Sequence, residues 1–182
     1  TSFGERNGKY FTVSINGGLE EPLPIVNGGF ATLSPDGLQL CFTPVDREFR
    51  TWKRYKGGRA TELWTYDLTN HTSQQITHWA GSDQWPTWHG EYIFYASDQD
   101  TRLNIWRYNT QNKENVQITH HKDFDVMWPS GRNGKLVYEN GGYLYVLNLA
   151  SGTSDKISVS INYDNPNLLP YFKNVKDFVG SF

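Results

Sequence analysis

The amino-acid sequence predicts an all-β fold, a fragment of a β-propeller with four-stranded antiparallel blades. An aromatic strand pattern recurs at a period of about 40 residues, the length of a four-stranded propeller blade. Each copy of the pattern ends in a polar turn and a short second strand, as in a β-hairpin. No stretch of about ten residues shows helical periodicity, so helices do not compete with this prediction.

The repeat is clearest in three hairpins. Their first strands read ELWTYDL at 62–68, NIWRYNT at 104–110 and YLYVLNL at 143–149. Trp106 follows Trp64 by 42 positions, and Tyr145 follows Trp106 by 39. We expect these large rings to lie between neighbouring blades, because the flat faces of propeller blades pack against one another.

We expect one partial propeller domain over residues 1–182. The predicted full blades are at about 28–77, 83–119 and 124–158, and the partial blades are at 9–25 and 162–182. The segment 176–182 resembles the inner strand of a further blade. Since propellers close with 4–8 blades, we expect a piece of a larger ring. The alternative is that the C-terminal segment completes the first, partial blade.

Composition and charge argue against several classes of function. A formal net charge of −2 does not suit a nucleic-acid partner, which attracts basic surfaces. No run of 18 apolar residues exists, so no membrane span is predicted. Cys41 is the only cysteine and lies in an apolar run, which predicts a buried thiol and no internal disulfide. The sequence does not decide between a cytoplasmic and a periplasmic location.

A basic and aromatic insertion at 46–59 interrupts the first full blade between its second and third strands. A link of two to five residues would suffice there, and long loops often carry function. The candidate peptide-binding residues are Arg50, Trp52, Lys53, Arg54 and Arg59. One interpretation is a lip that recognises a peptide through arginine, for example at its C-terminal carboxylate. The other is a structural flap with solvated charges.

Two further sets of residues could suggest chemistry. Asp83 and Asp125 lie 42 positions apart at equivalent places, which favours a repeated structural hydrogen bond over a single acid–base site. The histidines at 89, 120 and 121 match no metal-binding spacing.

The sequence evidence for a catalytic site is equally weak. Ser34 belongs to the turn sequence SPDG and has no nucleophile elbow around it. The acids at 98, 100, 123 and 139 do not form a marked pair of the glycosidase type. We therefore predict no catalytic residue, no metal and no cofactor in this chain.

Several stretches resemble the propeller of tricorn-type proteases. They are residues 49–58, 62–67, 88–90, 124–129, 139–145 and 169–175. The resemblance extends from about Lys9 to Phe182, and the insertion between Pro44 and Ala60 is its most specific part.

This resemblance implies a parent protein in which a six-bladed propeller precedes a second propeller, a PDZ-like domain and a serine peptidase core. In that family the propellers form channels that restrict passage to or from an enclosed active site. The implied role is a non-catalytic substrate-channel and docking element. Its partners would be peptide substrates, the remaining domains and, through open blade edges, a second copy of the chain. The alternative is a stand-alone protein-interaction propeller of the periplasmic scaffold type.

Overall fold

A computed structural model describes residues 8–45, 53–162, 170–176 and 180. Its regular elements are fourteen strands, so the all-β prediction is confirmed. The strands are β1 (Phe11–Thr12), β2 (Glu21–Pro22), β3 (Ala31–Leu33), β4 (Gln39–Phe42), β5 (Trp64–Asp67), β6 (Ser73–Gln75), β7 (Asp83–His89), β8 (Tyr92–Asp100), β9 (Arg102–Asn109), β10 (Asn115–Gln117), β11 (Val126–Arg132), β12 (Lys135–Asn140), β13 (Tyr143–Asn148) and β14 (Ser154–Lys156). No helix in the described ranges combines the length and apolar character needed to cross a membrane.

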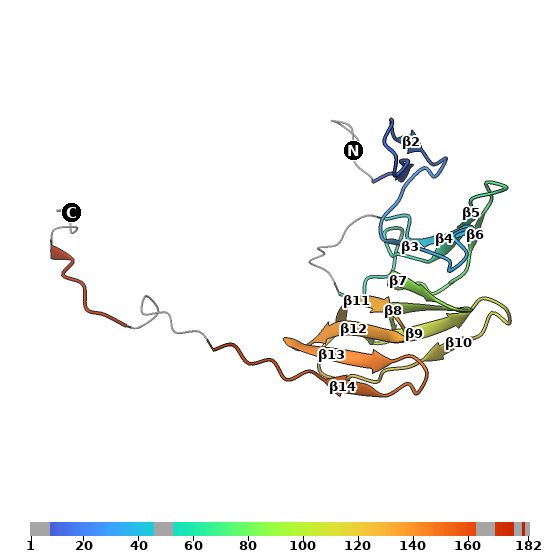
Figure 1. Ribbon diagram of the computed structural model, residues 1–182. Coiled ribbons are helices and arrows are strands. Elements are labelled where there is room, and N and C mark those ends of the chain that lie inside the picture. Colours follow the sequence, from blue (N-terminus) through green and yellow to red (C-terminus); the bar gives the residue numbers. More distant parts are fainter. Residues whose placement is uncertain (1–7, 46–52, 163–169, 177–179, 181–182) are drawn as a thin grey trace.

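The strands form three four-stranded antiparallel sheets and one two-stranded ribbon (Figure 1). We call β3–β6 the first blade, β7–β10 the second and β11–β14 the third. Within each blade the strands pair in chain order, and β1 pairs with β2. Figure 1 shows the blades following one another around a curve, with β7 and β11 toward its inner side. The predicted fold class, a propeller fragment of four-stranded antiparallel blades, is confirmed.

Strand register repeats between the blades. Trp64 lies opposite Phe42 in the first blade, and Trp106 lies opposite Tyr95 in the second. Tyr145 lies opposite Tyr138 in the third blade. These pairs define equivalent positions, and the remaining residues of the blades can be compared by counting from them.

Hydrophobic clusters lie between the neighbouring blades. The cluster between the first and second blades contains Cys41, Leu63, Ile76, Ile93, Tyr95 and Tyr108. The cluster between the second and third blades contains Phe94, Ile105, Val126, Leu136, Tyr138 and Leu147. Trp106 packs against the first cluster and Tyr145 against the second. The predicted position between blades is therefore confirmed for Trp106 and Tyr145, whereas Trp64 packs against the first blade's cluster with Ile25. The predicted burial of Cys41 is also confirmed.

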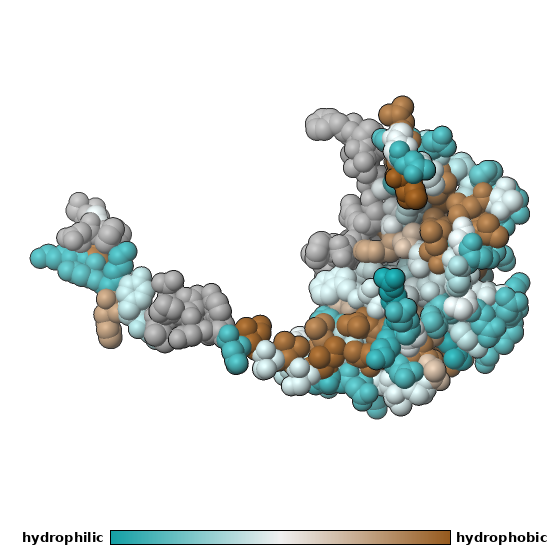
Figure 2. Space-filling model, in the orientation of Figure 1, coloured by the Kyte–Doolittle hydropathy of each residue, from teal (hydrophilic) through white to brown (hydrophobic). Residues whose placement is uncertain are grey.

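The two ends of the array differ in their packing. On the N-terminal side, Ile25 is buried with residues of the first blade, and Tyr10 and Leu23 pack against the same cluster. On the other side, residues 157–162 lead away from the third blade, and brown hydrophobic surface lies over that blade (Figure 2). Most of the predicted inner strand at 176–182 lies outside the described residues.

Candidate functional site

The insertion predicted to bind peptides is described from Lys53 onward, so Arg50 and Trp52 lie outside the described residues. Lys53, Arg54 and Arg59 are exposed. The Lys53 ammonium forms an ion pair of 2.8 Å with the Asp125 carboxylate at the start of the third blade. Since the Lys53 side chain remains 68% exposed, the ion pair adds little stability and leaves the ammonium accessible to a ligand.

Two further contacts fix the insertion against the second blade. The Arg54 guanidinium donates to the backbone carbonyl of Thr101, in the turn between β8 and β9, at 3.1 Å. The Lys56 ammonium lies 4.7 Å from the centre of the Trp79 ring, within the range of a cation–π contact. The insertion thus leaves the first blade and contacts both following blades on one face of the array.

The predicted equivalence of Asp83 and Asp125 is wrong by one residue, because the strand register makes Val126 the equivalent of Asp83 and leaves Asp125 just before β11. Asp125 accepts a hydrogen bond from the Leu103 backbone N–H at 3.1 Å, as predicted for a structural acid. Asp83 is fully buried, and neither of its carboxyl oxygens has a hydrogen-bond partner among the described residues, so the predicted repetition of this bond at Asp83 is wrong. Burial therefore raises the pKa of Asp83 to about 6, although the nearby Ser97 and Thr77 side chains oppose the rise.

Of the three histidines considered as metal ligands, His121 has a packing role, whereas His120 is exposed. The His121 ring packs against Tyr138 and Tyr145, and its Nε2 lies 2.9 Å from the Tyr138 hydroxyl. Partial burial lowers the pKa of His121. No group of three or more histidines, cysteines or acids in the described ranges could hold a metal ion.

Ser34 is part of a turn. Its hydroxyl donates to the Asp36 carboxylate at 2.5 Å and accepts a hydrogen bond from the Gln39 N–H at 2.9 Å. The bond from Ser34 is the main reason that the pKa of Asp36 is lowered. These bonds close the turn between β3 and β4 and give the hydroxyl no basic partner for nucleophilic catalysis.

A groove of about 410 Å³ lies where the inner strands β3, β7 and β11 meet. Its lining residues are Phe30, Ala31, Thr32, Trp85, Pro86, Thr87, Trp128, Pro129, Ser130 and Gly131, and none of them carries a formal charge. Trp85 and Trp128 occupy equivalent β-bulges with φ of 52° and 48°, a conformation that is uncommon for a bulky side chain. The buried Trp85 indole N–H has no partner among the described residues.

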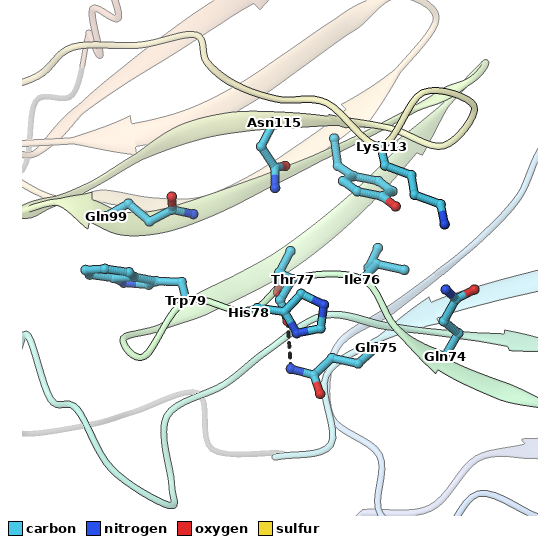
Figure 3. A pocket seen from close by; sticks show the side chains of 10 residues that line it. Gln74, Gln75, Ile76, Thr77, His78, Trp79, Gln99, Lys113 and Asn115 are labelled. Carbon is cyan, nitrogen blue, oxygen red and sulfur yellow. Dashed lines mark hydrogen bonds between the residues drawn. The ribbon is translucent and has the colours of Figure 1, made fainter.

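A second groove, of about 430 Å³, opens between the first and second blades (Figure 3). One wall is the continuous segment 74–79, and the other carries Gln99, Tyr108, Lys113 and Asn115. Figure 3 shows these side chains on two facing walls, with Trp79 at one end and Lys113 near the other. Neither groove was predicted from the sequence, because the residues that line them are common in strands and turns and form no motif.

A family model, the tricorn protease N-terminal β-propeller domain, matches residues 1–153. The chain belongs to this family. The tricorn protease homolog of Saccharolobus solfataricus is 24% identical over 172 residues, which cover 93% of this chain and 16% of the homolog. The tricorn protease homolog 1 of Streptomyces coelicolor is 24% identical over 170 residues, covering 92% of this chain and 16% of that protein. The chain thus spans about a sixth of the curated relatives it matches.

Solved structures confirm the fold. The crystal structure of the tricorn protease superposes with a TM-score of 0.72 at 19% identity, covering 85% of this chain and 15% of that one. TolB from Acinetobacter baumannii superposes with a TM-score of 0.67 at 18% identity, covering 85% of this chain and 39% of TolB. In a propeller the first strand of each blade lies nearest the central channel, so the groove at β3, β7 and β11 faces that channel.

Proposed function

We propose that this tricorn-family propeller is a non-catalytic substrate-channel and docking element of a serine peptidase that degrades peptides. The observation that carries the proposal is an uncharged aromatic groove on the channel side of three successive blades, in a chain matched by the tricorn propeller model over residues 1–153. Aromatic and hydroxyl side chains contact a passing chain without the strong attraction that a charged wall would exert on one sign of substrate.

The insertion supports the same proposal. Lys53, Arg54 and Lys56 place three cations on one face of the array, over the links and turns of the second and third blades. Cations at such a position favour the approach of anionic peptide groups, including a terminal carboxylate.

The proposal is tested with the full-length protein that contains this propeller. We expect Arg50→Ala combined with Arg54→Ala to lower kcat/KM for peptides by about tenfold, the size of one lost charge-assisted contact. Lys135→Ala, on the exposed end of β12, is the matched control and should leave kcat/KM unchanged. The isolated chain should hydrolyse no peptide. Unchanged kinetics in the double variant, or hydrolysis by the isolated chain, would contradict the proposal.

A further inference from the structure

The clefts before and after the second blade differ, although both follow the same strand pattern. In the cleft between the second and third blades, the His121 ring lies 5.6 Å from the Tyr138 ring and 5.2 Å from the Tyr145 ring. The two tyrosine rings stack with their centroids 5.4 Å apart, and the Tyr138 hydroxyl forms a hydrogen bond of 2.6 Å with the Ser154 hydroxyl. Aromatic packing thus fills this cleft.

The cleft between the first and second blades has Trp79 at the position of His121. The Trp79 indole N–H donates to the Asp98 carboxylate at 2.6 Å, and Lys56 lies over the indole ring. Gly81 makes room for this pair, since a Cβ there would collide with both Asp98 and Trp79. The third blade has Gly141 at the position of Asp98 and offers no such acceptor. Trp79 is therefore held at the end of the cleft, and a groove of about 430 Å³ remains open.

The chemistry of this inter-blade groove is dominated by carboxamides. Gln74, Gln99 and Asn115 line it from both walls (Figure 3). Asn115 Oδ1 accepts a bond of 3.0 Å from the Tyr95 hydroxyl, which orients its amino group. A carboxamide presents donors and an acceptor together, and these are the groups that each unit of an unpaired peptide needs to satisfy.

The charge of the groove indicates which part of a peptide it would bind. Lys113 and His78 are its basic lining residues, and none of the described residues that line it carries a carboxylate. One wall is six consecutive residues, 74–79, which begin within β6, and β5 is the one neighbour that β6 has among the described strands. A long polar wall beside an edge strand suits an extended ligand, and a lysine at one end suits an anionic terminus.

We propose that the inter-blade groove binds the C-terminal end of an extended peptide. The carboxamides of Gln74, Gln99 and Asn115 pair with its peptide groups, and the Lys113 ammonium binds its terminal carboxylate. The inference rests on the proposed function, and it assigns peptide capture to a site separate from the channel groove and from the insertion.

The experiment uses the ¹⁵N-labelled chain and an acetylated hexapeptide of alternating alanine and serine with a free carboxylate. We expect the side-chain NH₂ signals of Gln74, Gln99 and Asn115 to shift together and to saturate. The same peptide with a C-terminal amide should bind about tenfold more weakly, because it lacks the charge-assisted contact.

Matched variants assign the carboxylate contact. Lys113→Met should lower the affinity for the free acid to that of the amide, and Lys113→Arg should keep the preference for the acid. Lys135→Met, an equally exposed lysine outside the groove, should change nothing. Backbone signals of the third blade report in each case whether the variant is folded.

Three results would overturn the inference: no saturable shift in the three carboxamides, equal affinity for acid and amide, or shifts produced by maltohexaose in place of the peptide. If the peptide shifts signals of the insertion or of the inner strands β7 and β11 alone, the proposed function stands and the inter-blade groove is excluded as the site. Loss of both sets of shifts would remove support from both proposals.

Discussion

The second and third blades carry the same strand pattern in the same register, yet their forward faces differ. In the second blade, Phe94 and Ile105 are 2% and 0% exposed, because the third blade covers them. The equivalent pair in the third blade, Val137 and Leu144, is 39% and 44% exposed. The repeat therefore determines which positions are apolar, whereas the neighbouring sheet determines which of them are buried. Repeat-equivalent substitutions therefore have unequal effects.

The largest difference is expected for the buried core. Ile105→Ala should lower the free energy of unfolding by about 3 kcal/mol, through lost transfer energy and the cavity left behind. Leu144→Ala, its equivalent on the open face, should change it by about 0.5 kcal/mol. Urea unfolding of both variants, followed by circular dichroism, measures this. Equal losses would show that the two faces are similarly covered, and a longer protein that covers β12 and β13 should raise the cost of Leu144→Ala.

The acids at the starts of the inner strands should differ in their pH dependence. Burial raises the pKa of Asp83 from 3.8 to about 6. Between these pH values the carboxyl group is protonated in the native state and ionised in the unfolded chain. This contribution to the free energy of unfolding is present below pH 4 and is lost as the pH rises to about 6. Asp83→Asn should therefore stabilise the chain at pH 8, by an amount on the order of 3 kcal/mol, and by little at pH 4.

Asp125→Asn is the matched control for that substitution. Asp125 keeps one hydrogen bond and one exposed ion pair, so its replacement should bring no gain at pH 8 and a loss of less than about 1 kcal/mol. Thermal unfolding of both variants at pH 4 and pH 8 makes the comparison. A stabilisation by Asp83→Asn that does not change with pH would contradict the buried-carboxyl explanation.

The smallest effect is expected at the contact between the insertion and the third blade. Lys53→Met removes the ion pair with Asp125, but the lysine side chain is 68% exposed. Loss of the ion pair should lower the free energy of unfolding by about 0.5 kcal/mol or less at low salt. In 0.5 M salt the change should not be measurable, because a Debye length between about 3 and 8 Å screens the pair. Denaturation at the two salt concentrations is the measurement. A large loss that persists at high salt would mean that this contact holds the insertion in place.

The blades were predictable because their pattern is local. The rings at 64, 106 and 145 mark equivalent strands, and the register places each opposite Phe42, Tyr95 or Tyr138. The grooves were not predictable in this way. The inter-blade groove depends on Trp79 pairing with Asp98, 19 positions away, and the signal available in the sequence was that neither residue recurs in the next repeat, which has His121 and Gly141.

The sequence by itself determined the all-β class and the blade period, because strand alternation, turn residues and ring spacing act over a few residues. Its individual stretches, the insertion above all, carried the resemblance to the tricorn family. The tertiary structure decided the environment of residues that have similar places in the repeat. Asp83 became a buried acid while Asp125 became an ion-pair partner, and one cleft stayed open while the next was filled. The physical reason is that burial, pKa and groove shape depend on what a neighbouring sheet brings within a few ångströms, and spacing along one chain does not specify those contacts.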